Sequence, residues 1–260
     1  MKCGWVTAFP PRDETGYPVW RMATFGLVHG AGHGAWCWER LAPILEARGH
    51  RVYAMDLPCE DQTAGNERYA EVVDHAIPAT NDLVLVGHSL AGLTIPLVAA
   101  RRPVALLVFL CAQVPEFGRN LFDQVQADPD LYHPVARSHP GRLTAADGTV
   151  TFRDAEALRD VFYQDCSPED ARWAFARMRA QSAAPRREPC RLRAWPPGER
   201  AYILCRDDHA IAPAWSRRVA KARLGVEPIE LEGSHSPFVA QPETLADVLD
   251  GLAQGRRAVA

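Results

Sequence analysis

The chain has 260 residues, of which 47% are hydrophobic and 23% are charged, and its formal net charge is -3. These values predict a globular domain with a sizeable core, and they argue against a basic nucleic-acid-binding protein or one held at an anionic membrane by charge. The seven cysteines are odd in number and include no Cys-x-x-Cys, which argues against both a disulfide framework and a zinc site. No apolar run approaches the roughly 18 residues that span a bilayer, and the first residues lack a signal-peptide core, so we expect a cytoplasmic protein.

The first 21 residues are predicted to stand outside the fold, because prolines and glycines interrupt them and no hydrophobic period persists. The first strand begins directly after Met22. Either Met22 is the true initiator or residues 1–21 form a loosely attached extension. The rest of the chain is expected to form one α/β core from residues 22–112 and 196–260, with residues 113–195 inserted as a cap.

Short apolar strands alternate with helical segments along the core. Strands are predicted at residues 23–28, 51–55, 83–86, 104–110, 201–205 and 226–231. Helices are predicted at residues 38–48, 67–79, 90–100, 213–222 and from Pro242 onward. This alternation predicts a mostly parallel sheet with helices on both faces.

The stretch around Ser89 carries the most informative motif. An apolar strand runs into Gly87-His88-Ser89-Leu90-Ala91, and an apolar segment that reads as a helix follows despite Pro96. A Gly-x-Ser turn between strand and helix indicates a nucleophile elbow, in which the serine hydroxyl projects above the sheet. The usual glycine two residues after the serine is replaced by Ala91, which is small enough for the close contact. A Gly-x-Ser tripeptide also arises by chance, so the flanking strand and helix carry the assignment.

A glycine-rich loop, residues 29–36, follows the first strand. It lacks the sequence signatures of phosphate and dinucleotide loops. We therefore interpret it as an oxyanion loop, with the backbone N–H groups of Ala31 and Leu90 facing the reacting oxygen. His29 and His33 are four residues apart but lie in a loop without an apparent third ligand, so we expect them to order the loop rather than to bind a metal.

Three residue types suited to acyl transfer each follow a strand directly. Ser89, Asp208 and His235 occur in the chain order that α/β hydrolases use, and the carboxyl ends of parallel strands meet at one edge of the sheet. A serine hydroxyl is a weak nucleophile at neutral pH and needs a base. His235 would take its proton, and Asp208 would hold the imidazole in the correct tautomer.

Other residues could fill two of these roles. Asp207 is an alternative acid beside Asp208, and Glu116 is a more distant one. His88 and His209 are alternative bases, although His235 occupies the loop where the base is expected. Spacing alone leaves the choice of acid open.

Between residues 113 and 195 the strand–helix rhythm gives way to prolines, polar loops and short helical pieces. A small helical layer that packs on its own aromatic residues would explain this composition. It would equally suit a cap that roofs the active site and excludes water. Large apolar residues scattered through this segment include Phe117, Phe122, Tyr132, Phe162, Tyr163, Trp173, Phe175 and Met178.

Three motifs together resemble the branch of the α/β-hydrolase superfamily that contains plant methylesterases and hydroxynitrile lyases. They are the run from His29 to Trp38, the elbow Gly87-His88-Ser89-Leu90, and residues 202–211. The resemblance extends from residue 23 to about residue 254. It implies an α/β-hydrolase fold with an inserted helical cap, and it sets Asp208 rather than Asp207 at the acid position.

The branch contains both esterases and lyases, and two positions help to separate them. The lyases carry threonine where this chain has Gly30, and lysine directly after the catalytic histidine, where this chain has Ser236. Neither lyase feature is present, so the resemblance implies an esterase. Similar bacterial proteins include esterases of bulky synthetic esters.

We therefore expect a serine hydrolase that cleaves small to medium carboxylic esters through an acyl-enzyme, with a small-molecule ester as its partner and with neither a cofactor nor a metal. A lyase using the same three residues, or a ligand-binding protein that keeps the fold, are the alternatives.

Overall fold

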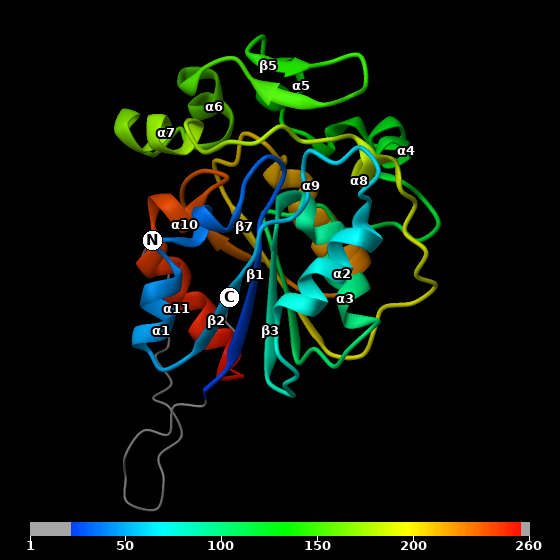
Figure 1. The fold of residues 1–260 in the computed structure, drawn as a ribbon, viewed down its shortest axis with the longest axis vertical. Helices are drawn as coiled ribbons and strands as arrows, with labels where there is room; N and C mark the ends of the chain where they lie inside the picture. The colour runs from blue at the N-terminus through cyan, green and yellow to red at the C-terminus, as the bar shows by residue number, and fades with distance from the viewer. Residues whose placement is uncertain (1–21, 256–260) are drawn as a thin grey trace, which may run out of the picture.

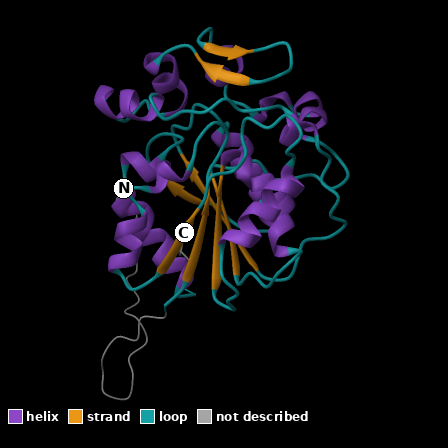
Figure 2. Ribbon diagram, in the orientation of Figure 1, coloured by secondary structure: helices purple, strands orange, loops and turns teal. Residues whose placement is uncertain are grey.

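A six-stranded, wholly parallel sheet forms the centre of the computed structural model, which describes residues 22–255 (Figures 1 and 2). The extension predicted for residues 1–21 lies outside the described residues. The strand order is β2-β1-β3-β4-β7-β8. The strands are β1 (Thr24–Val28), β2 (Arg51–Ala54), β3 (Leu83–His88), β4 (Leu106–Leu110), β7 (Glu199–Cys205) and β8 (Ile229–Leu231). The predicted mostly parallel sheet is therefore confirmed.

Helices cover both faces of this sheet (Figure 2). Every residue of β1, β3 and β4 is buried, as central parallel strands require. One face packs against α2 (Asn66–Ala76), α3 (Ile95–Ala99) and α9 (Pro213–Val219), and α9 continues into a π-helical turn, Ala220–Leu224. The other face packs against α1 (Ala42–Ala47), α10 (Pro237–Ala240) and α11 (Pro242–Ala253).

The register of the strands brings their carboxyl ends to one edge. Val28 at the end of β1 pairs with Gly87, and His88 at the end of β3 pairs with Leu110 at the end of β4. Cys205 at the end of β7 pairs with Leu231 of β8. The loops that follow these strands therefore emerge side by side.

Two helices are shorter than the sequence predicts, and a proline accounts for each. The helix expected at residues 38–48 begins only at Ala42, after a 3₁₀ turn (Ala35–Trp38). The helix expected at residues 90–100 is a 3₁₀ helix, η2 (Ser89–Leu93), followed by α3. Pro43 and Pro96 lie in the first turns of α1 and α3, where the missing N–H does no harm; deeper in a helix each would break it.

We call residues 113–195 the cap, and most of this segment lies across the carboxyl edge of the sheet (Figure 1). The cap contains α4 (Leu121–Ala127), a 3₁₀ turn (Pro129–Leu131), α5 (Pro134–Ser138), α6 (Ala155–Phe162), α7 (Pro168–Phe175) and α8 (Ala184–Arg187). It also contains an antiparallel hairpin of β5 (Arg142–Thr144) and β6 (Val150–Phe152). The sequence predicts the helices of the cap but not this hairpin. No helix within residues 22–255 combines the length and apolarity that a membrane span requires.

Candidate active site

Ser89 lies at the sharp turn between β3 and η2, and its φ is 52°, in the left-handed region that residues other than glycine rarely adopt. Close packing around the turn holds this conformation. A Cβ on Gly87 would lie 2.8 Å from the side chain of Ile95 and 3.0 Å from the carbonyl oxygen of Ala91. This is the strained strand–helix turn that a nucleophile elbow requires.

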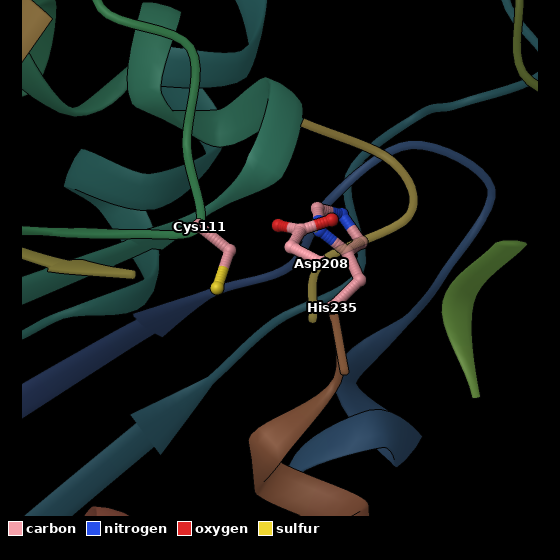
Figure 3. A group of neighbouring side chains, drawn as sticks. All are labelled: Cys111, Asp208 and His235. Atoms are coloured by element: carbon pink, nitrogen blue, oxygen red, sulfur yellow. The ribbon is translucent and has the colours of Figure 1, made fainter. Parts of the chain in front are cut away.

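His235 and Asp208 form a buried acid–base pair. His235 Nδ1 lies 2.8 Å from Asp208 Oδ2, and both side chains are almost fully inaccessible to solvent (Figure 3). The other carboxylate oxygen of Asp208 accepts hydrogen bonds from the amides of Ala210 and Ile211 at 2.7 and 2.9 Å. These bonds orient the carboxylate so that Oδ2 faces His235 Nδ1. The imidazole therefore carries its proton on Nδ1 and donates it to Asp208 Oδ2. His235 Nε2 is buried and has no hydrogen-bond partner among the described residues, which leaves its lone pair free.

The alternative acids and bases occupy other positions. Asp207 is exposed, and Glu116 forms ion pairs with Arg119 and Arg223. His209 Nδ1 lies 2.9 Å from the carbonyl oxygen of Asp160. Of the three candidate acids, only Asp208 bonds His235, which is the acid that the resemblance implied.

Contacts around His88 join His235 to the elbow. His88 precedes Ser89 in the chain, and its Nε2 donates to the carbonyl oxygen of His235 at 3.0 Å. The centroids of the His88 and His235 rings are 4.6 Å apart, and Phe162 of the cap stacks on His235 at 5.1 Å. Burial lowers the pKa of His88 well below its usual value, so this ring stays neutral beside the base.

The glycine-rich loop passes directly over the elbow. A Cβ on Gly30 would lie 2.8 Å from Ser89 Cβ and 2.7 Å from His88 Nδ1, so the loop backbone is as close to the serine as sterics permit. The amide of Ala31 donates to no other described residue. Leu90 is the second residue of η2, and the first amides of a helix lack partners within it. Ala31 and Leu90, the predicted oxyanion donors, line the same cavity as Ser89.

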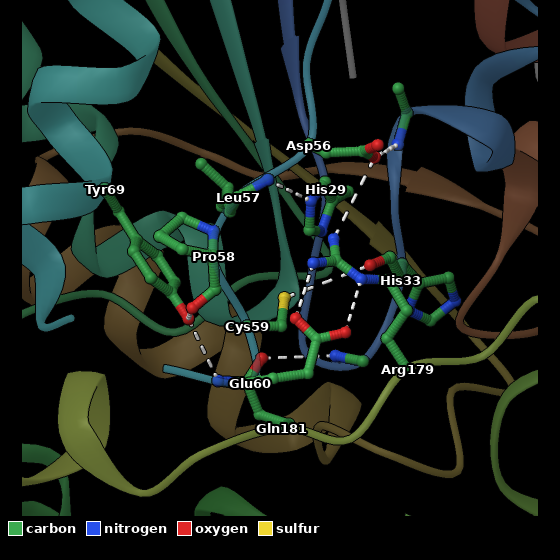
Figure 4. A network of polar contacts seen from close by, with 12 residues as sticks. His29, His33, Asp56, Leu57, Pro58, Cys59, Glu60, Tyr69, Arg179 and Gln181 are labelled. Carbon is green, nitrogen blue, oxygen red and sulfur yellow. Dashed lines mark hydrogen bonds and ion pairs between the residues drawn. The ribbon is translucent and has the colours of Figure 1, made fainter. Parts of the chain in front are cut away.

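A polar network fixes the shape of this loop (Figure 4). His29 Nδ1 donates to the carbonyl oxygen of Gly30, and its Nε2 accepts from the amide of Leu57, each at 2.9 Å. On the cap side, the amide of Arg179 donates to the carbonyl oxygen of Gly32 at 2.7 Å, and the amide of Gly32 donates to Gln181 Oε1 at 3.2 Å. Core and cap therefore hold the loop from opposite sides.

His33 completes the loop. Its Nδ1 donates to the carbonyl oxygen of Ala31 at 2.9 Å, and its Nε2 accepts from the Tyr163 hydroxyl at 2.6 Å. Burial lowers the pKa of His33 to about 3 and that of His29 to about 4, so both rings are neutral at physiological pH. In each histidine one ring nitrogen bonds the loop backbone and the other bonds a residue outside the loop, in agreement with an ordering role.

A cavity of about 340 Å³ opens above Ser89 between the core and the cap. Ala31, Gly32, Ser89 and Leu90 form its floor. Four of the eight cap residues named from the sequence line it, namely Tyr132, Phe162, Phe175 and Met178. The cap therefore covers the candidate site with apolar side chains and is not only a layer that packs on its own aromatic residues.

Cys111 lies beside the acid–base pair, on the side of Asp208 (Figure 3). Its backbone φ is 44°, its thiol is buried, and the possible ligand atoms of Cys111, Asp208 and His235 lie within 4.8 Å of one another. Such a set could hold a metal ion in principle. Because Asp208 and His235 bond each other, we interpret the cluster as an acid–base pair packed against a thiol. Burial raises the pKa of that thiol well above its usual value.

The comparison with protein families decides the relationship. The sequence model described as "Alpha/beta hydrolase family" matches residues 27–248, which is most of the chain. This chain belongs to the alpha/beta hydrolase family. Within the family it lies in the branch of the plant methylesterases. It is 29% identical to Methylesterase 2 of Arabidopsis thaliana over 90% of this chain and 97% of that protein. It is 30% identical to Salicylic acid-binding protein 2 of Nicotiana tabacum over 85% of this chain and 93% of that protein.

Solved structures of alpha/beta hydrolases share the fold. Polyneuridine aldehyde esterase superimposes with a TM-score of 0.76 at 23% identity, covering 90% of this chain and 100% of that one. A pyrethroid hydrolase from Sphingobium faniae JZ-2 superimposes with a TM-score of 0.70 at 25% identity, covering 90% and 98%. The match spans both core and cap.

Some residues of this alpha/beta hydrolase site have no signal in its sequence. The sequence does not distinguish Phe162 from the other aromatic residues of the cap, and only the fold shows that it stacks on His235. Arg186 belongs to an arginine-rich stretch near the end of the cap, yet it is buried and lines the cavity. Periodicity could not have revealed this burial, because α8 has only four residues.

Proposed function

We propose that this protein is a serine esterase that cleaves small to medium carboxylic esters, with Ser89 as nucleophile, His235 as base and Asp208 as its orienting acid. The observation that carries the proposal is the Asp208–His235 pair, tied to the elbow with Nε2 of the imidazole unpaired. In acyl transfer the unpaired Nε2 takes the serine proton, and the strained turn presents the serine hydroxyl to the ester.

In the first half-reaction, Ser89 Oγ attacks the ester carbonyl carbon while His235 Nε2 takes the hydroxyl proton. Asp208 Oδ2 accepts the Nδ1–H bond and stabilises the imidazolium that forms. The C–O bond to the alcohol then breaks, and the alcohol leaves with the proton from Nε2. The acyl group remains on Ser89 Oγ.

In the second half-reaction, water takes the place of the alcohol. His235 Nε2 removes a proton from water while the water oxygen attacks the acyl carbon. The bond between that carbon and Ser89 Oγ then breaks, Oγ takes the proton back from Nε2, and the carboxylic acid leaves. In both steps the amides of Ala31 and Leu90 donate to the oxyanion, and each such donor typically contributes about 3 kcal/mol of transition-state stabilisation.

Relatives support the ester as substrate class. The relatives include methylesterases of Arabidopsis thaliana and a probable esterase of Oryza sativa, which covers 86% of this chain at 29% identity. The cavity is mostly apolar around Ser89, as a site for neutral ester groups should be.

Lyase chemistry has less support. The resemblance assigned threonine to the Gly30 position in the lyases, and even a Cβ at Gly30 would overlap the space of Ser89 and His88. Ser236, which stands where the lyases carry lysine, is buried and supplies no positive charge.

Turnover of p-nitrophenyl acetate and of mandelonitrile by the purified protein tests the proposal. We expect ester hydrolysis that falls by about 10⁴-fold or more in Ser89→Ala, because the covalent step is lost. Ser138→Ala is the matched control: this serine is exposed on the cap, and we expect unchanged turnover. Cyanide release without ester hydrolysis would establish the lyase instead, and ester hydrolysis that survives in Ser89→Ala would overturn the assignment of the nucleophile.

A further inference from the structure

Four arginines line the cavity above Ser89, whereas its walls contain no Asp or Glu within the described part of the chain. Arg179 is neutralised, since its guanidinium pairs with both carboxylate oxygens of Glu60 at 2.8 and 2.6 Å. The other three are Arg137, Arg142 and Arg186. The cavity of a candidate esterase thus carries an excess of positive charge.

Arg186 is the most unusual of the three because it is buried, with 7% of its surface exposed. Its three hydrogen bonds all leave from Nη2 and reach carbonyl oxygens of Gly148, Gln181 and Ser182 at 3.2 to 3.3 Å. Its Nε is buried without a partner. Within residues 22–255, no carboxylate oxygen lies within 4.0 Å of its guanidinium.

Arg142 on β5 adds a second uncompensated charge. Its side chain forms no ion pair or hydrogen bond with the described residues, although it lines the same cavity. Burial, together with the charge of Arg142, lowers the pKa of Arg186, whereas the nearby groups that would raise it are tyrosines. A guanidinium nevertheless stays protonated at neutral pH, so both charges persist.

A purely structural role does not account for this arrangement. Three carbonyl oxygens need only a neutral donor, and burying an unpaired charge costs far more free energy than burying a neutral one. A bound anion would remove that cost and would use the fork of donors that guanidinium offers to a carboxylate.

We infer that the ester substrate carries a separate carboxylate group, which Arg186 and Arg142 bind while the ester carbonyl lies at Ser89. This inference rests on the proposed esterase function. Gln181 links the two positions: its carbonyl oxygen accepts from Arg186 Nη2, and its Oε1 accepts from the amide of Gly32 in the oxyanion loop. Half-esters of dicarboxylic acids and esters of carboxyphenols belong to this class.

Two matched substrate pairs test the inference. Monomethyl glutarate and methyl pentanoate differ by a carboxylate on the acyl side, and 4-acetoxybenzoate and phenyl acetate differ by one on the alcohol side. We expect the anionic member of at least one pair to have a kcat/KM at least about tenfold higher, since one charge-assisted contact is worth that much. Added salt should reduce the preference.

Substitution of the arginine should remove the preference for the anionic ester. In Arg186→Met we expect the ratio of the two kcat/KM values to fall to one or below, mainly through a higher KM for the anionic ester. Arg186→Lys, which keeps the positive charge, should retain part of the preference for the anionic ester. Arg187→Met is the matched control: Arg187 is next in the chain, exposed and absent from the cavity wall, so the ratio should stay unchanged. If Arg186→Met does not fold, Arg142→Met provides the same test from β5.

Binding without turnover gives a separate measurement. Glutarate should bind Ser89→Ala in calorimetry, and binding should be at least about tenfold weaker when Arg186→Met is added. Hydrolysis of the neutral esters with no preference for either anionic member, or a preference that persists in both arginine variants, would overturn the inference and leave the esterase intact. Turnover of none of the four esters would overturn the esterase itself.

Discussion

At the scale of single residues, the choice between two adjacent aspartates is the clearest outcome. Asp208 is 2% exposed and accepts hydrogen bonds from His235 and two amides, whereas Asp207 is exposed to solvent. The sequence left this choice open on spacing, because either carboxylate follows the strand directly. The turn after β7 decides it, since it directs only the second side chain inward.

Asp208→Asn should therefore lower kcat for an ester substrate by about 10⁴-fold, because the amide no longer fixes the tautomer that leaves Nε2 free. The measurement is steady-state hydrolysis of p-nitrophenyl acetate. Asp207→Asn is the control and should stay within about twofold of the wild type, because the Asp207 side chain is exposed and does not bond His235. Equal losses in both variants would contradict the assignment.

Gly30 is a second position where one atom matters. In Gly30→Ala the new Cβ would lie under 3.0 Å from both Ser89 and His88, so the loop must move away from the elbow. A displacement of about 1 Å at reacting groups can cost roughly 100-fold in rate, and we expect a loss of kcat of that order. Steady-state kinetics of ester hydrolysis would measure this loss of kcat, in a Gly30→Ala protein whose circular dichroism spectrum matches the wild type. An unchanged kcat would mean that the loop does not supply an oxyanion donor.

At the scale of elements, the strands could be predicted and several helices could not. Buried parallel strands are short apolar runs, and each of the six predicted runs overlaps a strand of the sheet. A proline is tolerated only in the first turn of a helix, so an α-helix begins just before Pro43 and another just before Pro96. Apolar spacing alone does not reveal these starts, and it predicts a single longer helix in each segment. The cap hairpin escaped prediction because β5 and β6 have three residues each, too few for a period to be recognised.

The last helix, α11, contains a glycine that no packing requires. A Cβ on Gly251 would meet no atom within 4 Å, and the residue lies inside the helix. Gly251→Ala should stabilise the protein by about 1 kcal/mol, because glycine loses more backbone entropy in a helix. Thermal unfolding followed by circular dichroism should show a Tm about 2–4 °C higher. A lower Tm would show that the helix end is strained.

At the scale of the whole molecule, three neutral histidines are buried around the base. Burial lowers the pKa values of His29, His33 and His88 in the folded protein, whereas in the unfolded chain each titrates near its usual value of 6.5. Below pH 6.5 the unfolded chain therefore binds more protons than the folded protein, and stability rises with pH in this range.

We accordingly expect the free energy of unfolding to fall between pH 7 and pH 5, by about 2 kcal/mol for each of His29 and His33, because the folded pKa values of about 4 and about 3 lie below this window. Urea unfolding followed by tryptophan fluorescence at pH 5, 6 and 7 measures the effect. His75→Gln, at an exposed histidine, should leave the slope unchanged. Equal stability at pH 5 and pH 7 would mean that these rings are protonated in the folded state.

The attachment of the cap to the glycine-rich loop has a consequence for engineering. Backbone groups of Gly32 bond the amide of Arg179 and the side chain of Gln181, so two positions of the roof help to shape the loop over the nucleophile. A chimaera that imports a foreign cap to change selectivity would discard these anchors. A chimaera that combines the core of this protein with a foreign cap, but keeps residues 179–181 of this chain, should retain turnover.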